Sequence, residues 1–234
     1  MNIKNSQIRA HARRLLDDNI FGKDWLKGVF VVLLMTLTHL ALTEVFAALA
    51  GVVTVALLVP VAAVESVVLE YIVIIVVYAM SMFIAFGLMG PLNVGVAAVY
   101  INLVRNDEKI RIKNFFCGFK KFVSSAVLSL MYTLVVTLWT LFFIVPGIYV
   151  AYSYALVFHV KSDNPTWGWK QCFDESERLM EGNRLKLFKL QISHLGWFII
   201  GLAFVGVGAL WAVPYVESST AVFYEQVRLE RGSR

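Results

Sequence analysis

Long apolar segments that contain no Lys or Arg are the feature that most constrains this chain. There are three such blocks, at residues 28–104, 122–160 and 190–227. The basic residues gather outside them, in four clusters at 4–27, 105–121, 161–189 and 228–234. A membrane-spanning helix needs about 20 mainly apolar residues, and loops held in the cytoplasm carry an excess of Lys and Arg. The pattern therefore predicts apolar blocks that cross a membrane between basic cytoplasmic segments.

The composition excludes the main alternatives. Hydrophobic residues make up 59% of the chain and charged residues 16%, against roughly 45–50% and about 25% in soluble domains. Two cysteines among 234 residues cannot form the disulfide framework of a small secreted protein. The net charge of +5 is explained by basic clusters that adjoin apolar blocks, so nucleic-acid binding is not expected. We predict an all-α, polytopic transmembrane helical bundle.

The number of crossings follows from the charge pattern. If all four basic clusters are cytoplasmic, each apolar block crosses the membrane an even number of times. Blocks 122–160 and 190–227 each have room for one helical hairpin, whereas block 28–104 has room for two long spans or four short ones. Four short spans in block 28–104 would require a cytoplasmic loop near residues 65–70. This region carries Glu65 and Glu70 instead of basic residues. We therefore favour six spans over eight, with both termini in the cytoplasm.

Glycine and proline mark the expected hairpin turns. Each block contains one such site, and together the sites suggest a weak threefold repeat in which Tyr154 and Tyr215 each lie seven residues after a turn glycine. The alternative is that Gly and Pro are simply frequent in membrane helices. The predicted turn residues are Gly90, Pro91, Pro146, Gly147, Gly206 and Gly208.

Two amphipathic helices are expected outside the apolar blocks. Residues 1–24 form a basic N-terminal segment in which Ile8, Ala12 and Leu15 recur at helical spacing. This helix either lies on anionic lipid or packs on its own protein. Residues 163–182 form the second, with Pro165 in the first turn and Gly182 at the C-terminal stop. The remainder, 25–234, is expected to be a single transmembrane domain.

The sequence contains no recognisable catalytic motif. The four histidines are too scattered to indicate a metal site, and no cofactor-binding motif is present. Cys117 and Cys172 fall in segments assigned to the reducing cytoplasm, so both are expected to be free thiols. We expect a protein that is not an enzyme and that has no catalytic residue, bound metal or cofactor.

Glu217 is the most informative polar residue, because it lies near the middle of an expected span. A charge in the bilayer centre costs about 3 kcal/mol on insertion scales. Two interpretations remain: a structural hydrogen-bond network between helices, or a binding site for a cation, a proton or a polar headgroup. If the three hairpins converge, the intramembrane polar site comprises Glu217, Ser218, Tyr215, Tyr154, Tyr152 and Asn93.

An ordered set of short motifs in the second half of the chain resembles a known family. The set includes Ile144–Ile148, Ala151–Ala155, Leu195–Phe198, Gly206–Gly208 and Pro214–Tyr215, with Gly90–Gly95 upstream. Together they resemble the bacterial integral-membrane family catalogued as domain of unknown function 975. Residues 40–80 depart from it, because this apolar stretch is longer than the family pattern. The resemblance implies a six-helix protein of the bacterial plasma membrane and supplies no biochemical activity.

Two functional classes fit the sequence. The first is a scaffold, an accessory protein or a factor that protects the membrane, in which the polar residues are structural. The second is a small transporter or lipid-handling protein with a polar site around Glu217. The expected partners are the lipid bilayer, anionic lipid at the basic segments, and either another membrane protein or a second copy of the chain.

Overall fold

The computed structural model describes residues 5–16, 22–61, 66–106, 110–196 and 207–232. The described residues contain helices and no strand, so the expected all-α class is confirmed. In chain order the helices are α1 (Asn5–Leu15), α2 (Lys23–Val61), α3 (Val67–Leu88), α4 (Gly90–Asn106), the 3-10 helix η2 (Ile112–Lys121), α5 (Phe122–Phe142), α6 (Ile144–Ser153), α7 (Val157–Asp163), α8 (Trp169–Met180), α9 (Arg184–Ile192) and α11 (Val207–Gly232).

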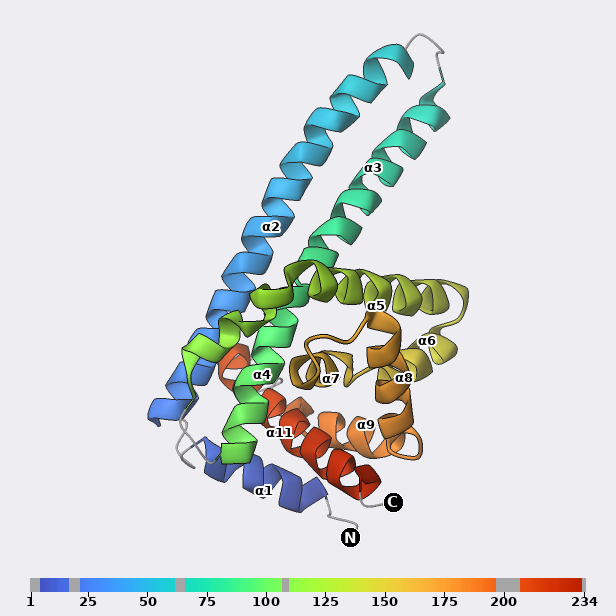
Figure 1. Ribbon diagram of the computed structural model, residues 1–234. Helices are drawn as coiled ribbons and strands as arrows, with labels where there is room; N and C mark the ends of the chain where they lie inside the picture. The colour runs from blue at the N-terminus through green and yellow to red at the C-terminus, as the bar shows by residue number, and fades with distance from the viewer. Residues whose placement is uncertain (1–4, 17–21, 62–65, 107–109, 197–206, 233–234) are drawn as a thin grey trace.

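The first apolar block folds into two long antiparallel segments (Figure 1). α2 has 39 residues and is therefore about 58 Å long. α3 returns beside it, and α4 continues in the direction of α3. The block thus contains two long helical segments rather than the four short ones that eight spans would require.

Gly90 and Pro91 do not form a hairpin turn, so this prediction is wrong. The chain reverses between the end of α2 at Val61 and the start of α3 at Val67, whereas Gly90 and Pro91 open α4. Gly90 has a packing role instead, because a Cβ atom there would overlap the backbone carbonyl of Ser125 in α5. Gly95 likewise allows α4 to approach the backbone of Phe115 in η2. A close approach between helices explains these glycines better than a turn does.

The second apolar block breaks at Phe143, whose extended backbone (φ −153°, ψ 127°) separates α5 from α6. Pro146 and Gly147 lie in the first turn of α6, where a proline is tolerated because its missing N–H needs no helical partner. The break therefore precedes the two residues predicted to form it. Gly147 packs on Thr140 of α5 so closely that a Cβ would overlap it. In the third block, Gly206 lies outside the described residues and Gly208 lies in the first turn of α11.

The core occupies the end of the molecule opposite the α2–α3 tip. There α11 packs against α1, α2, α4, α8 and α9, and Tyr100, Phe223 and Leu128 are fully buried. α1 buries Ile8, Ala12 and Leu15. Of the two alternatives for this helix, the structure therefore supports packing on its own protein.

The helix predicted within 163–182 is present but starts later than expected. α7 ends at Asp163, Pro165 lies in the following loop, and α8 begins only at Trp169. The Nζ atom of Lys161 holds this loop by donating hydrogen bonds to the carbonyls of Trp167 (2.6 Å) and Pro165 (3.0 Å). The predicted stop is confirmed, since Gly182 has the left-handed φ of +73° that favours glycine.

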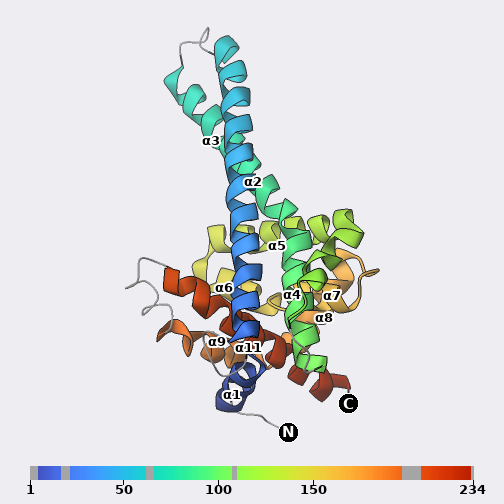
Figure 2. The ribbon, with the colours of Figure 1, turned by 90° about the vertical axis from the view of Figure 1, so that its left-hand side faces the viewer.

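Half of the α2–α3 pair extends away from the rest of the protein (Figure 2). Near the base of this extension the rings of His39 and Phe86 pack with their centroids 5.1 Å apart, and Ser129 of α5 donates a hydrogen bond to the carbonyl of Phe86. We define residues 40–59 and 67–85 as the projection. Most of its large apolar side chains are exposed, from 37% at Leu69 to 72% at Val59. About 20 residues of helix rise roughly 30 Å, which matches the hydrocarbon thickness of a bilayer.

Four described segments are long and apolar enough to cross a membrane: Lys23–Val59, Val67–Arg105, Ile112–Phe142 and Ile144–Asp163. The third predicted hairpin, 190–227, includes residues 197–206, which lie outside the described part of the chain. In addition, the axis of α5 makes a large angle with the axes of α2 and α3 (Figure 1), so these helices do not run parallel to one another as the spans of a simple bundle would. Six spans therefore stay a prediction, whereas a helical chain with several candidate spans is observed.

Candidate functional site

Glu217 lies on α11 where this helix faces α2 and α4. The Tyr100 hydroxyl of α4 is within electrostatic range of its carboxylate. Gly28 of α2 completes the junction, because a Cβ there would lie 2.9 Å from Pro214 and 3.2 Å from the Tyr100 hydroxyl. Glu217 is therefore partly buried, with neighbours from three helices. Its predicted position in the middle of a membrane span stays a prediction, because α11 is not among the segments long and apolar enough to cross a membrane within the described residues.

The neighbours of Glu217 on α11 are largely used in packing. The Tyr215 ring stacks on Trp25 at 6.2 Å and meets His194 edge-on at 4.7 Å. Ser219 donates a hydrogen bond to the carbonyl of Tyr215 (2.8 Å) and lies 3.2 Å from Nε2 of His194. Ser218 is fully buried, and its hydroxyl has no hydrogen-bond partner among the described residues.

The other predicted site residues lie elsewhere. Tyr152 donates a hydrogen bond to Oε1 of Gln191 in α9 (2.7 Å). The ring of Tyr154 packs on Phe173 of α8 at 4.5 Å. Asn93 lies in the first turn of α4 and is partly buried. The structure thus brings Tyr215, Ser218 and Glu217 together on α11, and it places both α6-side tyrosines against α8 and α9.

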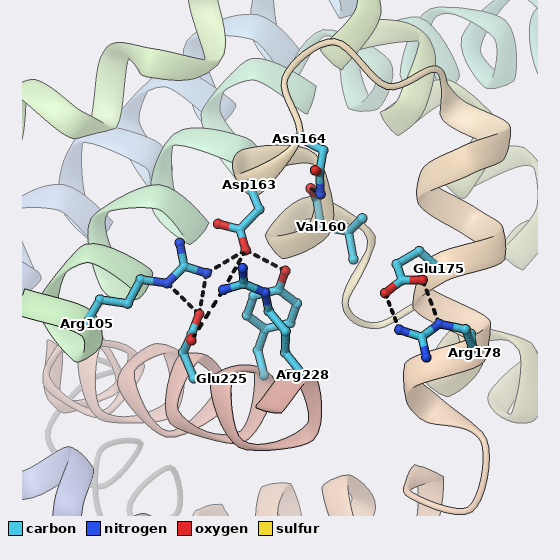
Figure 3. A network of polar contacts seen from close by, with 9 residues as sticks. Arg105, Val160, Asp163, Asn164, Glu175, Arg178, Glu225 and Arg228 are labelled. Atoms are coloured by element: carbon cyan, nitrogen blue, oxygen red, sulfur yellow. Dashed lines mark hydrogen bonds and ion pairs between the residues drawn. The ribbon is translucent and has the colours of Figure 1, made fainter. Parts of the chain in front are cut away.

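A network of charges that the sequence analysis missed joins α4, α7 and α11 (Figure 3). Arg105 donates from Nη2 to Oδ2 of Asp163 (2.5 Å) and from Nε to Oε1 of Glu225 (2.7 Å). The Tyr224 hydroxyl donates to the same Asp163 oxygen (2.8 Å). Arg228 lies 3.6 Å from both carboxylates. We call these five residues the charge network.

The charge network is balanced, and its two carboxylates are largely shielded from water. It contains two guanidinium groups and two carboxylates, and the side chains of Asp163 and Glu225 are only 10% and 12% exposed. Nearly buried carboxylates are stable when their charge is paired and hydrogen-bonded. The sequence could not reveal this arrangement, because Arg105 and Arg228 resemble ordinary members of the basic clusters and the partners of Arg105 lie 58 and 120 residues away in the chain.

Lys161 is a buried cation with a structural role. Its side chain is almost completely buried, and besides the two loop carbonyls its Nζ atom contacts the hydroxyl of Ser124 in α5 (2.6 Å). Three oxygen acceptors satisfy the three donors of an ammonium group. Lys161 therefore ties α7 and the loop before α8 to the start of α5.

Possible metal ligands and the buried thiol of Cys172 bear on the chemistry of the described residues. No group of three or more His, Cys, Asp or Glu side chains within the described ranges could hold a metal ion. Cys172 is fully buried on α8, and this burial raises the pKa of its thiol to about 11 despite the nearby Lys161. A thiol with such a pKa stays protonated at neutral pH and is a poor nucleophile.

The described part of the chain is helical and contains four segments that are long and apolar enough to cross a membrane. Segments of this kind are typical of integral membrane proteins. A family model described as "Protein of unknown function (DUF975)" matches residues 141–231, and the resemblance drawn from the sequence is confirmed over that segment. No match was found among curated proteins or among solved structures.

Proposed function

We propose that the chain is a non-enzymatic integral protein of the bacterial plasma membrane that acts as a scaffold or accessory protein, or protects the membrane. One observation carries this proposal: the polar side chains considered for a binding site are mostly engaged in contacts between helices. Tyr152 and Tyr154 bind α9 and α8, and Tyr215 is enclosed by Trp25 and His194. Polar groups used in this way stabilise an assembly rather than line a transport path.

The proposed placement in the membrane follows from charge and exposure. The projection has bilayer-matching length, an apolar surface and no Lys or Arg. The basic clusters belong to helices at the other end of the molecule, including α1, α8, α9 and the C-terminal part of α11 (Figure 1). With the cytoplasm on the basic side, both termini are cytoplasmic and the α2–α3 tip is outside. Six crossings are our proposal for the complete chain.

The cytoplasmic side offers a rigid platform. The charge network fixes α7 and α11 to α4, and Lys161 fixes the loop before α8. The outer face of α8 exposes Asp174 and Glu177, whereas its inner face is buried. Such a face repels anionic lipid and suits contact with a basic segment of a partner protein.

A second candidate, a small transporter or lipid-handling protein, is favoured by one observation at Glu217. The buried hydroxyls of Tyr100 and Ser218 have no hydrogen-bond partner among the described residues. Buried polar groups usually have partners, and an ion or polar headgroup held beside Glu217 would supply them.

Complementation of a deletion strain separates the two candidates. The strain is challenged with cationic membrane-active peptides after expression of wild type, Glu217→Gln or the double variant Asp174→Lys/Glu177→Lys. A scaffold or protective role predicts that Glu217→Gln restores resistance and that the α8 variant does not. A transport role predicts the reverse at equal membrane levels. Lys170→Glu, on the same helix, controls for a general effect of charge on α8.

A further inference from the structure

A cleft of about 410 Å³ lies between α1, α4 and α11, away from Glu217. Its apolar lining consists of Ile8 from α1, Val104 from α4, and Val222 and Leu229 from α11. Its polar lining consists of Gln7 and His11 from α1, Arg105 from α4, and Glu225 and Gln226 from α11. This volume falls within the range of roughly 300–1,000 Å³ that small-molecule sites occupy. Four aliphatic side chains from three helices therefore give one part of the cleft an apolar surface that suits an acyl chain.

One polar side chain that lines the cleft, Gln226, is buried without a hydrogen bond to another described residue. It lines the cleft and is only 8% exposed. Neither its amide nitrogen nor its amide oxygen has a hydrogen-bond partner within the described residues. An amide buried without hydrogen bonds costs free energy, which a ligand that can both donate and accept would recover.

The charges around the cleft indicate an uncharged polar group. Arg105 and Glu225 line the cleft, but they are paired with each other and with Asp163 and Arg228 in the charge network. Two positive and two negative groups leave no net charge for an ionic headgroup to neutralise. A carboxylate or phosphate would compete with Asp163 and Glu225 for Arg105, which is already hydrogen-bonded to both.

From these three observations we infer that the cleft binds an uncharged amphiphile with a single acyl chain, such as a monoacylglycerol. The chain lies along Ile8, Val104, Val222 and Leu229, and the hydroxyl or ester group hydrogen-bonds to Gln226. The cleft lies at the end of the molecule that we assign to the cytoplasmic side, opposite the projection. This inference goes beyond the scaffold role and does not depend on it.

The test uses the full chain in phosphatidylcholine nanodiscs, which avoids competition from detergent. The probe is a monoacylglycerol that carries a photoactivatable diazirine in its acyl chain. We expect saturable labelling that maps to α1, α4 or the C-terminal half of α11 and that unlabelled monoacylglycerol displaces. Labelling confined to the projection, or labelling that does not saturate, would mean contact with bulk lipid and would overturn the site.

Two variants locate the ligand. Leu229→Trp at the rim should weaken displacement by about tenfold, whereas Leu185→Trp, equally exposed on α9 (71% against 69%), should leave it unchanged. Gln226→Met keeps the volume but removes the amide, so it should weaken binding by roughly tenfold while the ligand-free melting temperature stays the same or rises. Equal affinity in Leu229→Trp and wild type would refute the assignment of the cleft.

Competitors identify the headgroup, and they do so with wild-type protein alone. A fatty acid and a lysophosphatidylglycerol of the same chain length should displace the probe at least tenfold less well than monoacylglycerol. Equal displacement by either anionic competitor would overturn the uncharged headgroup. Suppose that monoacylglycerol does not bind, but that the strain expressing Asp174→Lys/Glu177→Lys is still sensitive to the peptides. The inference about the cleft is then wrong, whereas the scaffold proposal stands.

Discussion

Removing Arg105 should destabilise the protein more than removing any exposed arginine does. The variant Arg105→Met keeps the aliphatic length but leaves Asp163 and Glu225, 10% and 12% exposed, without their shortest cationic contact. Breaking a fully buried ion pair costs about 3–5 kcal/mol, and an exposed pair contributes about 0–1 kcal/mol. Because Arg105 is 31% exposed and Arg228 remains 3.6 Å from both carboxylates, we expect a loss of about 2 kcal/mol.

Thermal unfolding of the purified protein measures this loss. For a protein of this size, 1 kcal/mol corresponds to a shift of roughly 2–4 °C in the melting temperature, so Arg105→Met should melt about 4–8 °C below wild type. Arg178→Met is the matched control, since Arg178 also makes a bidentate pair, with Glu175, but is 47% exposed. That variant should change the stability by no more than about 0.5 kcal/mol.

A double-mutant cycle identifies the cause of the loss. If the charge network is responsible, Arg105→Met and Asp163→Asn should be coupled by about 1–3 kcal/mol, and Tyr224→Phe should lose about 1.5 kcal/mol with its hydrogen bond to the carboxylate. Equal melting temperatures for Arg105→Met and Arg178→Met would show that the network contributes no more than a surface pair. The reasoning from burial would then be refuted.

Four further predictions follow from the structure. In intact cells a cysteine at position 66 should react with an impermeant maleimide added outside, and one at position 170 should not; labelling at Lys170→Cys from outside would reverse the topology. Cys172 should resist alkylation at neutral pH in the folded protein, because the burial that raises its pKa to about 11 keeps the thiol protonated; rapid modification would contradict its buried position. Glu217→Gln should retain wild-type stability and Glu217→Leu should lose about 1–2 kcal/mol if the residue is structural, whereas two wild-type-like variants would place it at the protein surface. Gly95→Leu should prevent the contact between α4 and η2 and lower the yield of folded protein, while Gly196→Leu, which has open space around it, should not.

The helical membrane-protein class could be read directly from the sequence. Three blocks without Lys or Arg impose this class because burial of so many apolar residues inside 234 residues of soluble protein is not feasible. The amphipathic spacing of Ile8, Ala12 and Leu15 also predicted a helix correctly, and Gly182 marked a helix end. These features depend on local periodicity and backbone preference, so residues that are neighbours in sequence are enough to predict where a helix lies and where it ends.

Distant contacts required the tertiary structure. Gly90 resembles a turn signal in sequence, yet the structure uses it to bring α4 against the α5 backbone, a choice that depends on which helices meet. Contacts between helices also separate the residues of the predicted intramembrane site. Tyr152 and Tyr154 contact α9 and α8 and do not lie beside Glu217. The charge network joins Arg105 to residues 58 and 120 positions away. Hydropathy and charge pattern determine that segments enter a membrane, whereas packing between helices decides which polar groups meet.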